Sequence, residues 1–500
     1  MSDEAARSPS ENADPITLAA LLGTASDGFD DIVLTGLTAD SRAVAPGFLF
    51  VAIPGTQADG ARFIPDAVAR GARAVAGEGE RPAALAGDIA YRRVSDARRT
   101  LALAAGRFYR DQPRDIVAVT GTAGKSSVAD FVRQIHAHLG ERAASIGTLG
   151  VVTTDGAAYG SLTTPDPTAL HRTLSEIARS GIAHVALEAS SHGIDQRRLD
   201  AVRISAAAFT NLGRDHLDYH PTMEEYLAAK MRLFTALLPE GAPAVVNADG
   251  DYAEQAIAVI KGTNHPLLTV GIKGETIRLV SNETIGFTQS LVIEHEGRHF
   301  EVAFPLIGAF QVENALVAAG LVIATGGEPE RVFDALAHLQ GVSGRLERVG
   351  EVNGALCIVD YAHKPDALAH VLDALRPYAT GDLVCLIGCG GDRDPGKRPI
   401  MGRIAVEKSD RVIITDDNPR SEDPAAIRAQ ILAAAPGAQE IGDRALAIRE
   451  TVRSLKAGDV LVVAGKGHET GQIVGDRTLP FSDHEAVRAA IAEASGETQA

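Results

Sequence analysis

The residues best suited to phosphate chemistry form a glycine-rich turn, Thr120–Ser127 (TGTAGKSS). An apolar run, Ile116–Thr120, precedes this turn, and Val128, Phe131 and Ile135 recur after it at helical spacing. Between a strand and a helix, backbone N–H groups can bind phosphate oxygens, a lysine can bind the β and γ phosphates, and a hydroxyl can bind Mg²⁺. The turn is shorter than the full GxxxxGK[ST] pattern, so an ordinary glycine-rich turn is the alternative. We expect ATP or GTP to bind here.

Two further apolar runs also end in polar residues. Glu188 follows the run Ala183–Leu187, and the segment Asn211–His216 follows the run Ala206–Thr210. Open α/β sheets bind their ligands beyond the carboxyl ends of the strands. Glu188 and His216 are therefore candidate metal ligands, and the alternatives are a solvated loop glutamate and a structural histidine.

Lys230 stands out because of its position on a predicted helix. Thr222 and Glu225 form a capping box for a helix over about 223–238, and Lys230 lies about 60° from the centre of its apolar stripe. Partial burial lowers the pKa of a lysine. A neutral amine reacts with CO₂ to give a carbamate, which would replace a cation with anionic oxygen ligands. The alternative is a lysine whose charged end reaches the solvent.

Three apolar runs near the carboxyl terminus each lead into a dense polar loop. These loops are Gly388–Arg398 after LVCLIG, Asp417–Arg420 after RVIIT, and Gly465–Glu469 after VLVVAG. Loops that follow neighbouring parallel strands together form one binding crevice. The loops contain both acidic and basic side chains, which suits a ligand with carboxylates and amines, since arginine binds a carboxylate through two hydrogen bonds. Solvated turns are the alternative for any one loop.

The elements that must position these residues follow a βα pattern. Short strands and helices alternate from 116 to about 247, and a hairpin turning near Glu296-Gly297 is predicted within 265–305, followed by a helix at Gln311–Thr325. Polar segments at 111–115 and 341–349 read as linkers. We expect an α/β protein of three domains: a small α/β domain (1–112), a central P-loop-type domain with a mostly parallel sheet and a β-hairpin region (113–341), and a Rossmann-like α/β domain (342–500).

Composition limits the possible partners. The chain has 500 residues, a formal charge of −17, 4% aromatic residues and no Trp, which argues against nucleic acid or an anionic membrane as the main partner. No apolar stretch reaches the length of a membrane span, and Met1–Pro15 lacks the features of a secretory signal. Cys357, Cys385 and Cys389 are too few for a disulfide framework, and we expect buried structural thiols in a cytoplasmic protein.

Taken together, these segments resemble the Mur ligases. The phosphate loop and the run TNLGRDHLDYH...YLAAK resemble the superfamily as a whole. LEASSHGIDQRRLD, GCGGDRDPGKRPIMG, DDNPRSEDP and GKGHETGQI resemble the members that add meso-diaminopimelate, and within the family the DNPR motif goes with diaminopimelate rather than lysine. The resemblance covers about residues 35–485.

The resemblance implies a role for each candidate residue. The predicted ATP contacts are Gly121, Thr122, Ala123, Gly124, Lys125, Ser126, Ser127, Asn314, Asp360 and His363. The predicted contacts of the UDP-muramoyl dipeptide are Ala39, Ser41, Thr56, Gln57, Ala58, Thr163, Thr164, Ser190, Gln196 and Arg198. The predicted diaminopimelate contacts are Arg393, Asp417, Asn418, Pro419, Arg420, Gly465 and Glu469. The predicted catalytic residues are Lys125, His216, Lys230 and Arg345, and the predicted Mg²⁺ ligands are Ser126, Glu188, His216 and the carbamate of Lys230.

The implied activity is ATP-dependent ligation. It would add meso-diaminopimelate to the D-glutamate γ-carboxylate of UDP-N-acetylmuramoyl-L-alanyl-D-glutamate through an acyl phosphate, in peptidoglycan precursor synthesis. We expect a monomer with small-molecule substrates, Mg²⁺, and no nucleic acid or membrane partner. Ala123 and Lys364 depart from the family's usual Asn and Thr. The alternatives are a lysine-adding or folylpolyglutamate-type ligase, a P-loop regulatory NTPase, and a non-enzymatic nucleotide-binding module.

Overall fold

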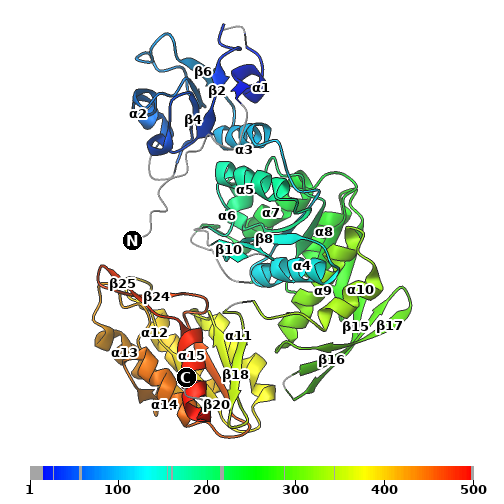
Figure 1. Ribbon diagram of the computed structural model, residues 1–500, viewed down its shortest axis with the longest axis vertical. Coiled ribbons are helices and arrows are strands. Elements are labelled where there is room, and N and C mark those ends of the chain that lie inside the picture. Colours follow the sequence, from blue (N-terminus) through cyan, green and yellow to red (C-terminus); the bar gives the residue numbers. More distant parts are fainter. Residues whose placement is uncertain are drawn as a thin grey trace. The chain divides into compact units, whose positions relative to one another are not determined.

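A computed structural model describes residues 15–25, 28–55, 59–154, 156–158, 162–213, 219–286, 288–342 and 344–496, apart from the side chains of 157 and 158. The chain folds into two compact units. The first comprises 1–279, 293–300 and 313–336, and the second comprises 280–292, 301–312 and 337–500. Three large sheets run through these units, of four, eleven and six strands (Figure 1). The three sheets, each with its own covering helices, give the predicted three-part α/β fold, although the boundary between the two compact units runs through strands β15–β17 of the eleven-stranded sheet.

The amino-terminal domain is a small α/β layer. Its four-stranded sheet has the order β3-β4-β5-β6 with all strands parallel. Helices α1 and α3 pack on one face of the sheet and α2 on the other. The elements are β1 (Ile16–Thr17), α1 (Leu18–Leu22), β2 (Val33–Leu34), β3 (Gly36–Thr38), η1 (Ser41–Ala43), β4 (Phe48–Ala52), η2 (Gly60–Phe63), α2 (Ile64–Ala69), β5 (Ala74–Gly77), β6 (Ala90–Arg93) and α3 (Ala97–Phe108).

The central sheet has eleven strands in the order β10-β9-β8-β11-β7-β12-β13-β14-β15-β16-β17. The pairings from β8 to β15 are parallel. Its first elements are β7 (Asp115–Thr120), α4 (Lys125–His138), β8 (Ala143–Gly147), β9 (Gly150–Thr153), β10 (Gly156–Ala158), α5 (Pro167–Arg179), β11 (His184–Glu188), α6 (Ser191–Asp195), β12 (Ala206–Phe209) and α7 (Met223–Arg232). The remaining elements are η3 (Leu233–Leu237), β13 (Ala244–Asn247), α8 (Ala253–Lys261), β14 (Leu267–Gly271), β15 (Ile277–Ile285), β16 (Thr288–His295), β17 (Arg298–Phe304), α9 (Ala309–Ala324) and α10 (Pro329–Leu336).

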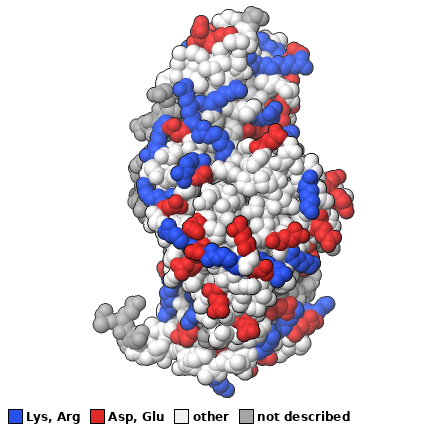
Figure 2. Space-filling view, turned by 90° about the vertical axis from the view of Figure 1, so that its right-hand side faces the viewer, with Lys and Arg blue, Asp and Glu red and all other residues white. Residues whose placement is uncertain are grey.

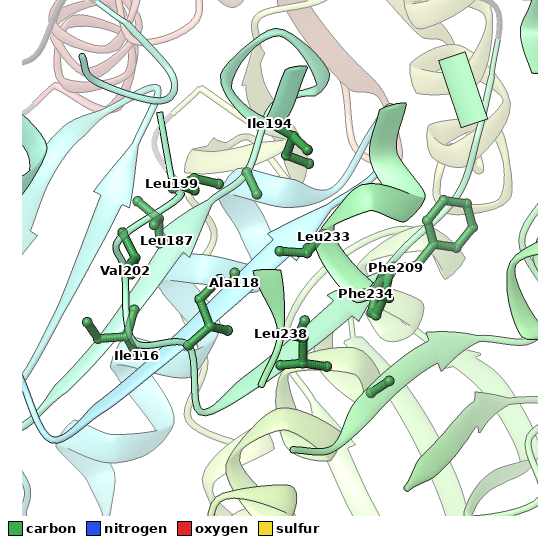
Figure 3. Packing of buried hydrophobic residues seen from close by; sticks show 14 of the residues in the cluster. Ile116, Ala118, Leu187, Ile194, Leu199, Val202, Phe209, Leu233, Phe234 and Leu238 are labelled. Atoms are coloured by element: carbon green, nitrogen blue, oxygen red, sulfur yellow. The ribbon is translucent and has the colours of Figure 1, made fainter. Parts of the chain in front are cut away.

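Helices cover both faces of the parallel strands, because each strand is apolar on both sides. Ile116 and Ala118 of β7, with Leu187 of β11 and Phe209 of β12, point into a core that α5, α6, α7 and α8 close (Figure 3). Helix α4 packs against β8, β11 and β7 from the other face. The neighbouring strands β11, β7 and β12 are paired in parallel, so their carboxyl ends lie at the same edge of the sheet.

The carboxyl-terminal domain is a second doubly covered sheet. Its order is β18-β19-β23-β20-β21-β22, parallel except for the β18–β19 pair. Helices α11, α12 and α13 pack on one face, and α14 and α15 on the other. The elements are β18 (Glu347–Val352), β19 (Ala355–Asp360), α11 (Pro365–Leu375), η4 (Arg376–Tyr378), β20 (Leu383–Ile387), α12 (Lys397–Lys408), β21 (Arg411–Ile414), α13 (Pro424–Leu432), β22 (Gln439–Glu440), α14 (Arg444–Arg453), β23 (Val460–Ala464), β24 (Gly471–Val474), β25 (Arg477–Pro480) and α15 (Asp483–Ser495).

Several local predictions are confirmed. The hairpin turns at Glu296-Gly297, where both residues have positive φ (50° and 73°), the backbone that a two-residue hairpin loop prefers. Thr222 caps α7 by accepting from the Glu225 N–H. One boundary differs, because α7 ends at Arg232 and a π-helical turn continues to Leu237, whereas the sequence predicts one helix to 238. The three cysteines are buried and free, as expected.

The surface carries charges of both signs. On the face in Figure 2, basic and acidic side chains are interspersed. In the described part of the chain, none of the helices combines the length and hydropathy that a bilayer crossing requires.

Candidate functional site

The phosphate loop connects β7 to α4 at the centre of the sheet. Gly121 and Gly124 both have positive φ (149° and 86°), and Gly124 caps α4. The loop is tied to the end of β12: the N–H groups of Thr122 and Ala123 donate to the backbone O and the Oδ1 of Asn211, at 2.9 and 3.0 Å. Lys125 Nζ donates to two loop carbonyls, those of Gly121 (2.9 Å) and Thr122 (3.0 Å). The strand, turn and helix of the predicted phosphate site are therefore present.

Lys230 is buried far more deeply than its predicted position at the edge of the stripe implies. It is 1% exposed, its Nζ donates to the Gly121 carbonyl at 2.8 Å, and it lies 4.4 Å from the centre of the Tyr226 ring. The alternative of a lysine that reaches solvent is therefore wrong. The physical reason is that Tyr226, one turn earlier, is itself buried with its hydroxyl 3.1 Å from Thr122 Oγ1, so this face of α7 packs on the loop. Lys230 and the phosphate loop form one cluster.

Glu188 ends β11, next to the phosphate loop. Its side chain is buried, and its carboxylate accepts from the Thr148 N–H (2.8 Å to Oε1) and the Thr148 hydroxyl (3.2 Å to Oε2). Ser126 is half-buried at the start of α4. Asn314 of α9 lies against the loop, since a Cβ at Gly124 would overlap its Oδ1. His216, the remaining predicted ligand, lies outside the described residues.

Five of the ten residues predicted to contact the UDP-muramoyl dipeptide lie beside the carboxyl end of β11. Thr164 Oγ1 donates to the Glu188 carbonyl (2.8 Å) and lies 3.0 Å from Ser190 Oγ. Arg198 donates to the Thr164 carbonyl (2.6 Å) and to Gln196 Oε1 (2.8 Å). Thr163 Oγ1 lies 3.0 Å from the hydroxyl of Thr148, the residue that holds Glu188. All five predicted residues therefore form one connected network.

A cavity of about 560 Å³ extends from this network to the amino-terminal domain. Ala39, Gln196 and Arg198, three of the predicted substrate contacts, line it together with Arg98 and Arg172. Ser41 is buried beside it in η1. Thr56, Gln57 and Ala58 lie outside the described residues. The sequence places Ala39 and Arg198 far apart, and the fold brings them to one cavity.

The polar loops of the carboxyl-terminal domain follow neighbouring strands, as predicted, because β23, β20 and β21 are adjacent. Asn418 donates to Glu469 Oε2 (2.8 Å), and Lys466 Nζ donates to Asn418 Oδ1 (3.0 Å) and Glu469 Oε2 (3.1 Å). Lys466 is 0% exposed, whereas the Glu469 side chain is 33% exposed. A buried cation therefore fixes the two side chains that the sequence assigns to the incoming amino acid.

The neighbouring residues of these loops are also strongly constrained. Gly465 has a φ of 118°, and a Cβ there would lie 2.7 Å from Asp417 Oδ2, so the close approach requires glycine. Arg420 has a φ of 51°, and its guanidinium donates to the Gly391 carbonyl at 2.9 Å. Pro419 precedes it in the same loop, and Arg393 is exposed on the loop after β20. Gly465, Asp417 and Arg420 are thus held in place beside Asn418 and Lys466 by close contacts within these loops.

The predicted nucleotide contacts in this domain have structural partners. Asp360 is buried, which raises the pKa of its carboxyl, and it accepts from the N–H groups of Leu346 and Ala362, both at 2.7 Å. Arg345 lies over the Tyr361 ring, 5.0 Å from its centre. Burial lowers the pKa of His363. Asp360 therefore anchors the loop that carries Arg345.

Sequence reasoning did not single out six contributors as individual residues. They are the cavity-lining Arg98 and Arg172, and Thr148, Asn211, Tyr226 and Lys466. Asn211 and Lys466 sit inside polar loops that the strand-end argument had already marked, so that signal could have found them. Thr148 and Tyr226 have no comparable local signal, because their role depends on contacts between elements.

Comparison with known proteins gives a consistent result. Three family models match: "Mur ligase family, catalytic domain" at 33–109, "Mur ligase middle domain" at 119–322, and "Mur ligase, glutamate ligase domain" at 344–467. UDP-N-acetylmuramoyl-L-alanyl-D-glutamate--2,6-diaminopimelate ligases from Bradyrhizobium diazoefficiens and Rhizobium meliloti are 59% and 58% identical to this chain. The matches cover 92% of this chain in both cases, and 95% and 94% of the respective relatives.

Solved structures agree with these matches. A structure of a ligase of that same name superposes with a TM-score of 0.74 at 32% identity, over 97% of this chain and 100% of the other. A MurF structure from Acinetobacter baumannii reaches a TM-score of 0.63 at 18% identity, over 96% of this chain and 100% of the other, which shows the shared fold. From its sequence relatives, its domain matches and its fold, this chain belongs to the Mur ligase family.

Proposed function

We infer that this chain catalyses the ATP-dependent addition of meso-diaminopimelate to UDP-N-acetylmuramoyl-L-alanyl-D-glutamate, a step of peptidoglycan precursor synthesis. The observation that carries this inference is the identity of 54% to 59%, over at least 92% of the chain, to five ligases that bear this name. The new amide joins the D-glutamate γ-carboxylate to an amine of diaminopimelate.

The chemistry explains why a phosphate loop is needed. A carboxylate is a poor acyl donor, so its oxygen attacks the γ-phosphorus of ATP, ADP leaves, and an acyl phosphate forms. The amine then attacks the acyl carbon, and phosphate leaves from the tetrahedral intermediate. Two anions must approach in the first step, and Lys125 with the N–H groups of Gly121–Ser127 would offset their repulsion. The Lys125 ammonium, which bonds loop carbonyls, would have to turn toward the phosphates when ATP binds.

The donor set fits Mg²⁺, which prefers oxygen ligands. Ser126 and the buried Glu188 carboxylate offer such oxygens, and we propose them as ligands with His216 and a carbamate on Lys230. When bound, Mg²⁺ would supply positive charge against the phosphates. The Lys230 amine is buried beside the Gly121 carbonyl. This burial supports the proposed carbamate, because an unmodified lysine would place a charged ammonium in the interior. Asn314, beside Gly124, would contact the nucleotide, as would Arg345, Asp360 and His363 of the second unit.

The 560 Å³ cavity suits the UDP-muramoyl dipeptide. Arg98, Arg172 and Arg198 line it, and guanidinium groups bind phosphate oxygens well. Ala39 and Gln196 line the same space, and Ser41, Thr163, Thr164 and Ser190, with the segment 56–58, complete the proposed contacts. The domain 1–112 would therefore hold the uridine nucleotide.

The carboxyl-terminal crevice suits diaminopimelate, which carries two carboxylates and two amines. The cationic Arg393 and Arg420 would bind a carboxylate, and Asp417 and Glu469 would bind an ammonium, with Asn418, Pro419 and Gly465 shaping the crevice. We assign ATP to the domain 113–341 and diaminopimelate to 342–500. We also propose a monomer that works in the cytoplasm, where ATP is available, without nucleic acid or membrane partners.

One assay tests the assignment against its rivals. Phosphate release is measured with ATP and the UDP-muramoyl dipeptide, with and without meso-diaminopimelate, lysine or glutamate. We expect release that requires the dipeptide and diaminopimelate. Equal stimulation by lysine or glutamate would indicate another ligase specificity, and release without any acceptor would indicate a regulatory NTPase.

A further inference from the structure

Two buried histidines and a glutamate converge at the end of the central sheet opposite the phosphate loop. His136 lies in the last turn of α4, Glu141 in the loop that follows, and His184 is the first residue of β11. Glu141 Oε2 is 2.6 Å from His136 Nδ1 and 3.6 Å from His184 Nε2. One ligand atom from each of the three therefore lies within 4.8 Å of the others. Two imidazole nitrogens and a carboxylate oxygen are a donor set typical of Zn²⁺ sites.

The second ring nitrogen of His184 also has a suitable neighbour. His184 Nδ1 is buried and has no hydrogen-bond partner of good geometry. It lies 3.3 Å from Oδ2 of Asp115, the residue of β7 that pairs with His184 of β11. Metal-binding histidines commonly donate their other N–H to a carboxylate, which fixes the tautomer that leaves the ligating nitrogen free. A small rotation of the ring would complete this hydrogen bond and aim Nε2 at Glu141.

A plain ion-pair network explains the cluster less well. The two imidazole rings are stacked with their centres 4.0 Å apart and their side chains 6% and 8% exposed, so a positive charge on both would be costly. Arg114 Nη2 lies 3.1 Å from His184 Nε2 and competes for that lone pair. Its side chain is 68% exposed, so it can move into solvent when a cation arrives.

We propose that His136, Glu141 and His184 bind a divalent transition metal of the Zn²⁺ class, supported by Asp115 and completed by water. Imidazole ligands favour such metals over Mg²⁺. The site is separate from the proposed Mg²⁺ site, because the six residues of β7 and the five of β11 run between the two and span about 13–17 Å at about 3.3 Å per residue. Its role would be to join α4 to the first residues of these two strands, and it is independent of the ligation chemistry.

Zn²⁺ titration of the full chain tests this proposal. The protein is treated with a chelator, desalted and titrated by calorimetry in excess Mg²⁺, which occupies the ATP-linked site. A second, exposed cluster of His138, Asp334 and His338 could bind Zn²⁺ adventitiously, so the experiment uses a His138→Asn/His338→Asn background. We expect one Zn²⁺ per chain.

Variants of the cluster decide the outcome. Glu141→Gln and His184→Gln should each weaken Zn²⁺ binding by more than about tenfold, and Asp115→Asn by about 10- to 100-fold. Arg114→Ala should bind equally or more tightly, and Glu141→Gln should ligate at the normal rate with Mg²⁺. If His184→Gln does not fold, the partly exposed Glu141 still provides the test. Absence of Zn²⁺ binding in the background protein, or unchanged affinity in Glu141→Gln, would overturn the proposal.

Discussion

Replacing Lys466 with methionine should selectively weaken diaminopimelate use. The lysine is fully buried, and its Nζ donates to Asn418 Oδ1 and Glu469 Oε2 at 3.0 and 3.1 Å. Methionine has similar length and fills the space, but it removes both hydrogen bonds. A hydrogen bond to a charged group contributes about 1.5–3 kcal/mol. Water can reach Glu469, whose side chain is 33% exposed, and would offset part of the loss. A net loss of about 2–3 kcal/mol corresponds to about 30- to 150-fold in binding.

Steady-state phosphate release provides the assay. We expect the KM for diaminopimelate to rise by about that factor, with the KM for ATP within about twofold of normal. Lys408→Met is the matched control, since Lys408 pairs with Asp373 at the surface of α12 and such pairs contribute about 1 kcal/mol or less. A folded Lys466→Met protein with normal KM for diaminopimelate, or one that loses ATP and diaminopimelate equally, would refute the reasoning.

Three further predictions concern other parts of the chain. Lys230→Ala should abolish ligation, since it removes the proposed carbamate, and near-normal turnover without CO₂ dependence would contradict that role. Arg420→Ala should raise the KM for diaminopimelate far more than the KM for ATP, and similar effects on both would count against the crevice. His171 is 0% exposed, and burial lowers its pKa from 6.5 to about 4. The unfolded chain therefore binds a proton that the folded chain excludes, so stability falls as pH drops from 6.5 toward 4. Between pH 7 and pH 5, the free energy of unfolding measured with urea should fall by about 2 kcal/mol less in His171→Leu than in the wild type. Equal decreases in the two proteins would refute this.

The parallel strands and their polar ends could be predicted because they depend on local patterns. An apolar run of five or six residues between turns predicts a buried strand, and the residues after it must lie at the ligand-binding edge of the sheet. Glu188, Asp417 and Gly465 follow from this rule and lie where expected. The burial of Lys230 exceeds its prediction, because helical spacing gives a side chain's direction but not what packs against it.

The sequence by itself determined the α/β class, the phosphate loop and the family resemblance, because these depend on short spacings and on the chemistry of single loops. Only the tertiary structure decided which distant residues meet. Lys466 becomes a fixed buried cation only when two loops close over it, and Asn211 reaches the phosphate loop only because β12 lies beside β7. His136 and His184 are neighbours only because α4 packs on β11. Such contacts depend on side-chain packing between elements, and this packing cannot be predicted from the local spacing of residues along the chain.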